Sequence, residues 1–224
     1  MRRHWLIVSI LVLAAFVLPS CGDDGPRRVL LVGDSVMNQT GAALTNVLRD
    51  DDIRNEGVNG SGLLTPDYLD WPEQLRGLLE RYDPDVVVFL FVGNFDLGTG
   101  EVFTTPDGHQ ITDRSDPRFF RSWQAQAQLM TERAAEDAEV AWVLPPPMED
   151  REGQAVVDGL REAYEEVADE TGAELIDAND VLATESGGYL AESENGTPLR
   201  NSDGVHLANE GAKRLARLIA DEIG

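Results

Sequence analysis

Histidine is scarce in this chain of 224 residues, and the scarcity limits where proton-transfer chemistry can take place. The only histidines are His4, His109 and His206. His206 follows Asp203 by three residues, in the stretch Asp203-Gly204-Val205-His206-Leu207. A carboxylate at that spacing can accept one imidazole N–H and fix the tautomer, which leaves the other ring nitrogen free to take a proton from a nucleophile. We therefore select His206 as the candidate general base and Asp203 as its orienting acid.

The other two histidines have weaker settings. His4 lies in the N-terminal apolar segment, and His109 follows Asp107 and Gly108 in a polar, turn-rich stretch. We expect His109 to be a solvent-exposed loop residue, in a setting not comparable to that of His206.

Ser35 is the candidate nucleophile. It follows a short apolar run in Gly33-Asp34-Ser35, at the start of a helical pattern. A hydroxyl in that place lies at the carboxyl edge of a parallel sheet, where N–H groups of a helix start stabilise developing negative charge. A serine at a helix start is also a common N-cap. The presence of Asp203 and His206 near the C-terminus favours the nucleophile over the cap.

Strand and helix patterns alternate through the chain, which predicts a doubly wound parallel sheet with helices on both faces. In such sheets the functional sites form beyond the carboxyl ends of the strands. Five apolar runs predict strands at 28–32, 53–58, 85–92, 139–144 and 174–176. Helical periodicity predicts helices at 35–49, 72–81, 119–138, 154–171 and 209–223. The polar stretch 98–117 is expected to be a long loop.

Gly33-Asp34-Ser35-Val36 after the first strand, with the stretch 203–207 near the C-terminus, resembles the GDSL/SGNH hydrolases over residues 28–224. The resemblance implies a flavodoxin-like, three-layer α/β/α fold. It also implies an esterase or lipase activity, and some members of this family are acyltransferases. The resemblance implies that Ser35 is the nucleophile, His206 the base and Asp203 the acid that orients the base.

The same resemblance implies an oxyanion hole built from the N–H groups of Ser35 and Gly60 and the side-chain amide of Asn94. Gly57 and Gly62 lie close enough to Gly60 to compete with it for this role. The family usually has Gly-x-Asn-Asp after the central strand, whereas this chain has Gly93-Asn94-Phe95-Asp96. Phe95 therefore stands where the amide is expected. Either Asn94 supplies the amide from an altered turn, or it is an ordinary turn residue and the hole is incomplete.

The first residues are typical of a secretory signal. Two arginines precede an apolar run that is shorter than the roughly 20 residues of a membrane-spanning helix. Leu18-Pro19-Ser20-Cys21 resembles a bacterial lipobox, in which the cysteine is lipidated. We expect a signal peptide at 1–20, a lipidated tether at 21–26 and a hydrolase-like domain at 27–224. The predicted location is the cell envelope, with membrane attachment only through the lipidated N-terminus. The alternative is a plain signal peptide or an uncleaved anchor, with an incidental cysteine.

Composition excludes several function classes. The chain carries 18 Lys and Arg against 41 Asp and Glu, for a net charge of −23. Nucleic acid is therefore not expected as a partner, because phosphate binding needs clustered basic side chains. One cysteine is too few for a disulfide framework or a multi-cysteine zinc site. We expect neither a metal nor an organic cofactor.

The sequence therefore predicts hydrolysis of a short acyl ester, on a small molecule or a glycan, through an acyl-serine intermediate. Two alternatives stay open: an O-acyltransferase acting on an envelope glycan, and a noncatalytic binding lipoprotein with a degenerate oxyanion hole. A lipoprotein unrelated to esterases would need both motifs to coincide by chance. Four aromatic residues are expected to fill the core rather than line an acyl or sugar cleft: Phe95, Phe103, Trp123 and Trp142. Nothing in the sequence marks an oligomer interface.

Overall fold

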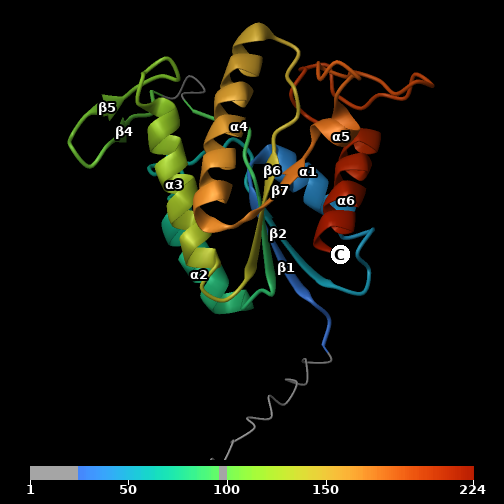
Figure 1. The fold of residues 1–224 in the computed structure, drawn as a ribbon, viewed down its shortest axis with the longest axis horizontal. Helices are drawn as coiled ribbons and strands as arrows, with labels where there is room; N and C mark the ends of the chain where they lie inside the picture. The colour runs from blue at the N-terminus through green and yellow to red at the C-terminus, as the bar shows by residue number, and fades with distance from the viewer. Residues whose placement is uncertain (1–24, 96–99) are drawn as a thin grey trace, which may run out of the picture.

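The computed structural model describes residues 25–95 and 100–224, and at its centre lies a five-stranded parallel sheet (Figure 1). The strand order is β2-β1-β3-β6-β7, with every neighbouring pair parallel. The predicted α/β fold with a five-stranded parallel sheet is confirmed. The strands are β1 (Arg28–Gly33), β2 (Asp52–Gly57), β3 (Val86–Leu90), β6 (Glu139–Leu144) and β7 (Glu174–Asp177).

Helices cover both faces of this sheet and complete three layers. On one side lie α1 (Ser35–Leu44) and α6 (Asn209–Ile223), with the short α5 (Asn179–Leu182) beside α6 (Figure 1). On the other side lie α2 (Trp71–Tyr82), α3 (Phe119–Ala134) and α4 (Arg151–Thr171). Each crossover between parallel strands thus carries a helix back across the sheet.

Two hydrophobic clusters fill the spaces between the layers. Alternate residues of a strand point to opposite faces, so Val29 and Leu31 of β1 join the cluster under α1 and α6. Leu30 and Val32 join the cluster under α2, α3 and α4. Burial on both faces explains why the central strands read as continuous apolar runs rather than alternating ones.

The aromatic side chains belong mainly to the second cluster, as the sequence predicted. Trp123 and Trp142 are fully buried, and Phe95 is 1% exposed. Trp142 stacks between Phe89 and Tyr164, with ring centroids 4.6 and 4.5 Å away. Phe103 is the exception, because its side chain is only partly buried. It lines a shallow pocket beside α3.

Two predicted helix boundaries were wrong, for local reasons. The first helix ends at Leu44 instead of continuing to residue 49, because its last turn tightens: the N–H groups of Asn46 and Val47 bond three residues back. The fourth long helix begins at Arg151 instead of residue 154, because the Asp150 carboxylate accepts the Gly153 N–H and caps an earlier turn.

Other boundaries differ as well, and three small elements were missed. The third long helix ends at Ala134 rather than at residue 138, and the central strand spans Val86–Leu90 rather than 85–92. Helix α5 was not predicted. The stretch expected to be a loop contains a two-stranded antiparallel hairpin, β4 (Phe103–Thr104) with β5 (Gln110–Ile111). Elements this short bury too little surface to leave a periodic pattern.

We predict that Tyr164→Phe lowers the free energy of unfolding by about 1–3 kcal/mol, since it leaves buried polar groups without a partner. The Tyr164 hydroxyl accepts the Trp123 indole N–H at 2.9 Å and donates to the Phe91 carbonyl at 3.2 Å. Urea unfolding measures the difference. Tyr68→Phe is the control, because this side chain is 56% exposed and water replaces its bond to the Asn59 carbonyl. Equal losses in the two variants would contradict this explanation.

Candidate functional site

The structure brings Ser35, His206 and Asp203 into one hydrogen-bonded chain. The Ser35 hydroxyl oxygen lies 2.8 Å from Nε2 of His206, and Nδ1 of the same ring lies 2.8 Å from Oδ2 of Asp203. Ser35 and His206 are 171 residues apart in sequence. Ser35 is the first residue of α1, directly beyond β1, whereas the other two lie in the loop before α6. This arrangement can move a proton from the hydroxyl to the imidazole.

The Asp203 carboxylate has a second role within its own loop. Its Oδ1 accepts the backbone N–H groups of Val205 and His206, both at 2.9 Å, while Oδ2 faces the imidazole. Burial alone raises the pKa of Asp203, but these hydrogen bonds to the charged form, backbone first, bring it down to about 2. The carboxylate therefore stays ionised near neutral pH. It fixes both the backbone beside His206 and the orientation of the ring.

Ser35 is not the N-cap of α1. That position belongs to Asp34, whose Oδ1 accepts the Val36 N–H at 2.9 Å. The alternative interpretation of Ser35 as a capping residue is therefore wrong. The reason is that Asp34 takes the cap from one residue earlier. The Ser35 hydroxyl is left to bond His206.

Asp34 also connects α1 to the end of the central strand. Its Oδ2 accepts the Val92 N–H at 2.7 Å and the Asn94 side-chain amide at 3.3 Å. The carboxyl group is fully buried, and burial raises its pKa to about 6 against the opposing effect of the backbone N–H groups of Val92 and Val36. The sequence analysis included Asp34 only as part of the motif Gly33-Asp34-Ser35-Val36 and predicted no role for its carboxylate. Its position between an apolar strand and a helix start was the available signal for a buried cap.

Asn94 lies at the edge of the site, whereas Phe95 turns into the core. The Asn94 amide nitrogen donates to Asp34 and, at 3.1 Å, to the Ser61 carbonyl. Phe95 is almost fully buried and packs edge-on against Phe119, with ring centroids 5.5 Å apart. The displaced asparagine thus still reaches the carboxyl edge of the sheet. Asp96, the last residue of this motif, lies outside the described residues.

The loop that carries Gly60 is held between α1 and the turn after β3. The Asn38 amide, one turn into α1, donates to the Asn59 side-chain oxygen at 3.0 Å. On the other side, Asn94 holds the Ser61 carbonyl. Gly60 lies between these two anchors with a left-handed φ of 77°, a conformation that favours glycine. Among the hydrogen bonds of residues 25–95 and 100–224, none uses the Gly60 N–H.

The two competing glycines have packing roles. A Cβ on Gly57 would lie 2.5 Å from the Asn38 nitrogen, so this glycine permits close contact of β2 with α1. A Cβ on Gly62 would lie 1.9 Å from the Asn94 carbonyl oxygen. Gly62 therefore lets the loop approach the turn that presents the Asn94 amide.

Gln39 is a site residue that was not predicted from the sequence. It lies on α1, one helical turn after Ser35, and its Oε1 accepts the Leu207 N–H at 3.0 Å. This bond ties the loop of His206 directly to the helix of Ser35. The available signal was the i, i+4 spacing from Ser35, which places both side chains on one face of the helix.

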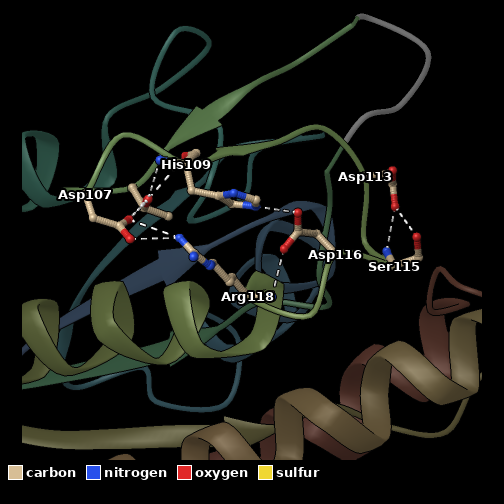
Figure 2. Close-up of polar contacts among 7 residues, drawn as sticks. Asp107, His109, Asp113, Ser115, Asp116 and Arg118 are labelled. Carbon is tan, nitrogen blue, oxygen red and sulfur yellow. Dashed lines mark hydrogen bonds and ion pairs between the residues drawn. The ribbon is translucent and has the colours of Figure 1, made fainter.

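His109 lies in the loop between β4 and β5, as expected, and its ring has a carboxylate partner that was not predicted. Its Nε2 lies 2.7 Å from Oδ2 of Asp116, and its side chain is 37% exposed (Figure 2). The neighbouring Arg118 pairs with Asp107 at 2.9 Å. No hydroxyl group of the described residues bonds the His109 ring, and Figure 2 shows Ser115 turned toward Asp113 instead. These contacts join the β4–β5 hairpin to the start of α3.

The described part of the chain contains no group of three or more His, Cys, Asp or Glu side chains placed to hold a metal ion. Within the same residues, no helix is long and apolar enough to cross a membrane. The predicted signal peptide, residues 1–20, and the predicted lipidation site, Cys21, lie outside the described residues.

Comparison with known proteins places the chain in a family. A family model described as a protein of unknown function, DUF459, matches residues 28–222, which is nearly all of the folded part. The chain belongs to the DUF459 family. No curated protein sequence matches it.

Several solved structures with the same fold are described as lipolytic proteins or esterases. A protein assigned to the G-D-S-L lipolytic family, from Desulfitobacterium hafniense, has a TM-score of 0.62 at 17% identity, with 86% of this chain and 97% of that chain covered. An acetylxylan esterase from Geobacillus stearothermophilus has a TM-score of 0.60 at 17% identity, over 89% and 95%. A carbohydrate acetylesterase from Sinorhizobium meliloti has a TM-score of 0.59 at 18% identity, over 88% and 98%. At these identities the likeness establishes a shared fold between this DUF459 chain and the SGNH-type hydrolases.

We predict that Asp34→Asn changes how stability depends on pH. The folded state raises the Asp34 pKa from 3.8 to about 6, so between these values the folded chain holds a proton that the unfolded chain has lost. The contribution of this group to stability is complete below pH 3.8 and is lost as pH rises through 6. The total change is on the order of 3 kcal/mol. Asp34→Asn cannot titrate and lacks this component.

Urea unfolding of both proteins from about pH 4 to about pH 7 measures this difference. The variant is expected to be less stable overall, because its amide N–H₂ faces backbone donors. The gap between the two stability curves should nevertheless narrow as pH rises. Parallel curves would show that Asp34 keeps an ordinary pKa in the folded state.

Proposed function

We propose that this DUF459 protein is a serine hydrolase of carboxylic esters that acts through an acyl-serine intermediate. The observation that carries the proposal is the chain of two 2.8 Å contacts from Ser35 through His206 to Asp203. The fold shared with acetylesterases and a G-D-S-L lipolytic protein is consistent with it. Because a fold alone does not define a function, the geometry of these side chains is the main support.

In the proposed reaction, His206 removes the Ser35 proton as the serine oxygen attacks the ester carbonyl. Asp203 holds the imidazole through Nδ1, so that Nε2 is the atom that accepts the proton. The tetrahedral intermediate collapses when His206 passes the proton to the leaving alcohol. Water, deprotonated by the same ring, then hydrolyses the acyl-serine and regenerates the hydroxyl. The proton that His206 takes from water passes to the Ser35 oxygen as the acyl bond breaks, and the products are an alcohol and a carboxylic acid.

Three donors are proposed to hold the oxyanion: the N–H groups of Ser35 and Gly60 and the Asn94 amide. The Ser35 N–H is available because the first N–H groups of a helix have no acceptor within the helix. The Gly60 N–H belongs to a loop anchored on both sides. In the unliganded site both Asn94 amide hydrogens have protein acceptors, so the amide must release one of them when the charge forms. We infer that the longer contact, 3.3 Å to Asp34, is the one released.

The proposed substrate is an ester of acetate or another short acyl group, carried by a small molecule or a glycan. Acetyl esters of carbohydrates are named for two of the structural neighbours, and this extends to the present chain only as a proposal. We further propose that the protein works in the cell envelope, attached through lipidated Cys21. Neither a metal nor an organic cofactor has a step in this mechanism.

We predict that Ser35→Ala abolishes hydrolysis of p-nitrophenyl acetate and butyrate, with a fall in kcat of roughly 10⁴–10⁶-fold. The nucleophile is lost while the cap on α1, which Asp34 provides, is retained. Ser115→Ala is the control, because its exposed hydroxyl bonds only Asp113 in the turn. If the folded parent shows no turnover in either assay, an acyltransferase or a binding protein is favoured over an esterase. A trapped acyl group on Ser35 would then indicate an acyltransferase, and its absence a binding protein.

We predict that Asn94→Ala lowers kcat by about 10²–10³-fold and leaves KM nearly unchanged, as expected for a donor used in the transition state. Steady-state kinetics with p-nitrophenyl acetate measure both constants. Asn46→Ala is the matched control, since its amide bonds only the Ala42 carbonyl near the far end of α1. An Asn94→Ala enzyme with full kcat would mean that the two backbone N–H groups suffice.

A further inference from the structure

Arg200 is a buried cation immediately before the loop that carries Asp203 and His206. Only 5% of this residue is exposed. Its Nη1 donates to the Val205 carbonyl at 2.8 Å, and its Nη2 donates to the Pro147 carbonyl. Within residues 25–95 and 100–224, no carboxylate lies within ion-pair distance of its guanidinium, and Nε has no hydrogen-bond partner. The guanidinium group therefore donates to backbone carbonyl oxygens and does not pair with a carboxylate.

The two carbonyls belong to different parts of the site. Val205 is the residue before His206, whereas Pro147 lies in the segment that follows β6 at the carboxyl edge of the sheet. The guanidinium fork spans the gap between them, because its two terminal nitrogens point in fixed directions. Arg200 thus attaches the loop of the candidate base to the framework of the sheet.

Among the described residues, the backbone hydrogen bonds of this loop close it on itself. Arg200 and Leu207 form an antiparallel bridge, and the Asn201 N–H donates to the His206 carbonyl at 2.8 Å. These bonds join one end of the loop to the other. On the side of α1 the loop is held by Gln39, through the Leu207 N–H. On the side of β6 it is held by the Arg200 side chain.

Burial of this cation has a cost that the contacts must offset. Removal from water lowers the pKa of Arg200 to about 10, and nearby Tyr189 and Asp203 oppose that shift only in part. The guanidinium also lies over the Tyr189 ring, 5.3 Å from its centroid. A stability role alone does not call for such an arrangement, since an apolar side chain of similar volume often packs as well as a buried ion.

We propose that Arg200 is a positioning residue for the candidate catalytic base: its fork between Pro147 and Val205 holds the 201–206 loop so that His206 meets Ser35. The inference rests on the proposed ester hydrolysis, and it deepens that function without adding a step to it. Arg200 has no side-chain hydrogen bond to Ser35 or to the His206 ring. It acts through the Val205 carbonyl, one residue before His206.

Arg161 provides a matched control for a purely structural arginine. It is also partly buried and donates to a carbonyl of the same proline run, that of Pro145, at 3.2 Å. Its other contacts are a two-pronged pair with Asp177, at 2.9 and 2.6 Å. None of these groups lies in the loop of His206. Arg161→Met should therefore lower stability without disturbing the base.

The experiment compares the full chain with Arg200→Met, Arg200→Lys and Arg161→Met. The first readout is the low-field proton resonance of the His206 Nδ1–H, assigned by its loss in His206→Gln and its persistence in His109→Gln. The second is kcat and KM for p-nitrophenyl acetate. The third is the midpoint of thermal unfolding. The resonance reports the bond to Asp203 whether or not the chain turns over an ester.

In Arg200→Met we expect loss of the His206 resonance and a fall in kcat on the order of 10²-fold at unchanged KM, since small displacements of catalytic groups have effects of this size. Arg161→Met should lower the unfolding midpoint yet keep the resonance and kcat. Arg200→Lys, which keeps the charge but lacks the fork, should fall between Arg200→Met and the parent in both readouts. If Arg200→Met does not fold, the resonance and kcat of Arg200→Lys test the positioning role.

Two results would overturn the proposal. One is a folded Arg200→Met, or failing that a folded Arg200→Lys, with the resonance and kcat of the parent. The other is an equal loss of both in Arg161→Met. If the parent chain hydrolyses no ester while its resonance disappears only in the Arg200 variants, the proposed function fails and the positioning role stands.

Discussion

Two parallel strands end side by side at the centre of the sheet, and one buried carboxylate, Asp34, connects the segments beyond them. It caps α1 through the Val36 N–H and binds the Val92 N–H and the Asn94 amide beyond β3. A fully buried carboxyl group is costly unless its oxygens are satisfied, so each of these donors is constrained to its place. The hydroxyl of Ser35 and the amide of Asn94 are both positioned relative to this one group.

The candidate base, His206, is positioned by an anchored loop and not by the buried Asp34 carboxylate. Among the described residues, no hydrogen bond joins the loop of His206 to Asp34. Instead, the Asp203 carboxylate binds the backbone N–H groups of Val205 and His206 and the His206 ring. Gln39 attaches it to the helix of Ser35, and Arg200 attaches it to the segment after β6. A loop with polar anchors on both sides can keep a 2.8 Å contact that a free loop would hold only part of the time.

The part of the chain that the structure describes contains two histidine–carboxylate pairs, and their comparison distinguishes a structural contact from a candidate catalytic one. His109 meets Asp116 at 2.7 Å, and His206 meets Asp203 at 2.8 Å, so the pairs are nearly equal in length. Only the second ring has a serine hydroxyl on its other nitrogen. That second contact, rather than the ion pair itself, is what makes proton transfer to a nucleophile geometrically possible.

Local patterns were enough to predict the five strands of the parallel sheet, the long helices and the burial of Trp123 and Trp142, because apolar periodicity follows burial. The contact of Ser35 with His206 is consistent with the predicted site, whose catalytic role stays a prediction. Long-range contacts account for the remaining features. Asp34 rather than Ser35 caps α1, and Phe95 turns inward while Asn94 stays at the site. Gln39 and Arg200 anchor a loop far away in sequence from α1 and β6. Each of these features depends on which hydrogen-bond donors and acceptors lie close together at the edge of the sheet. A local sequence pattern carries no information on contacts between distant segments.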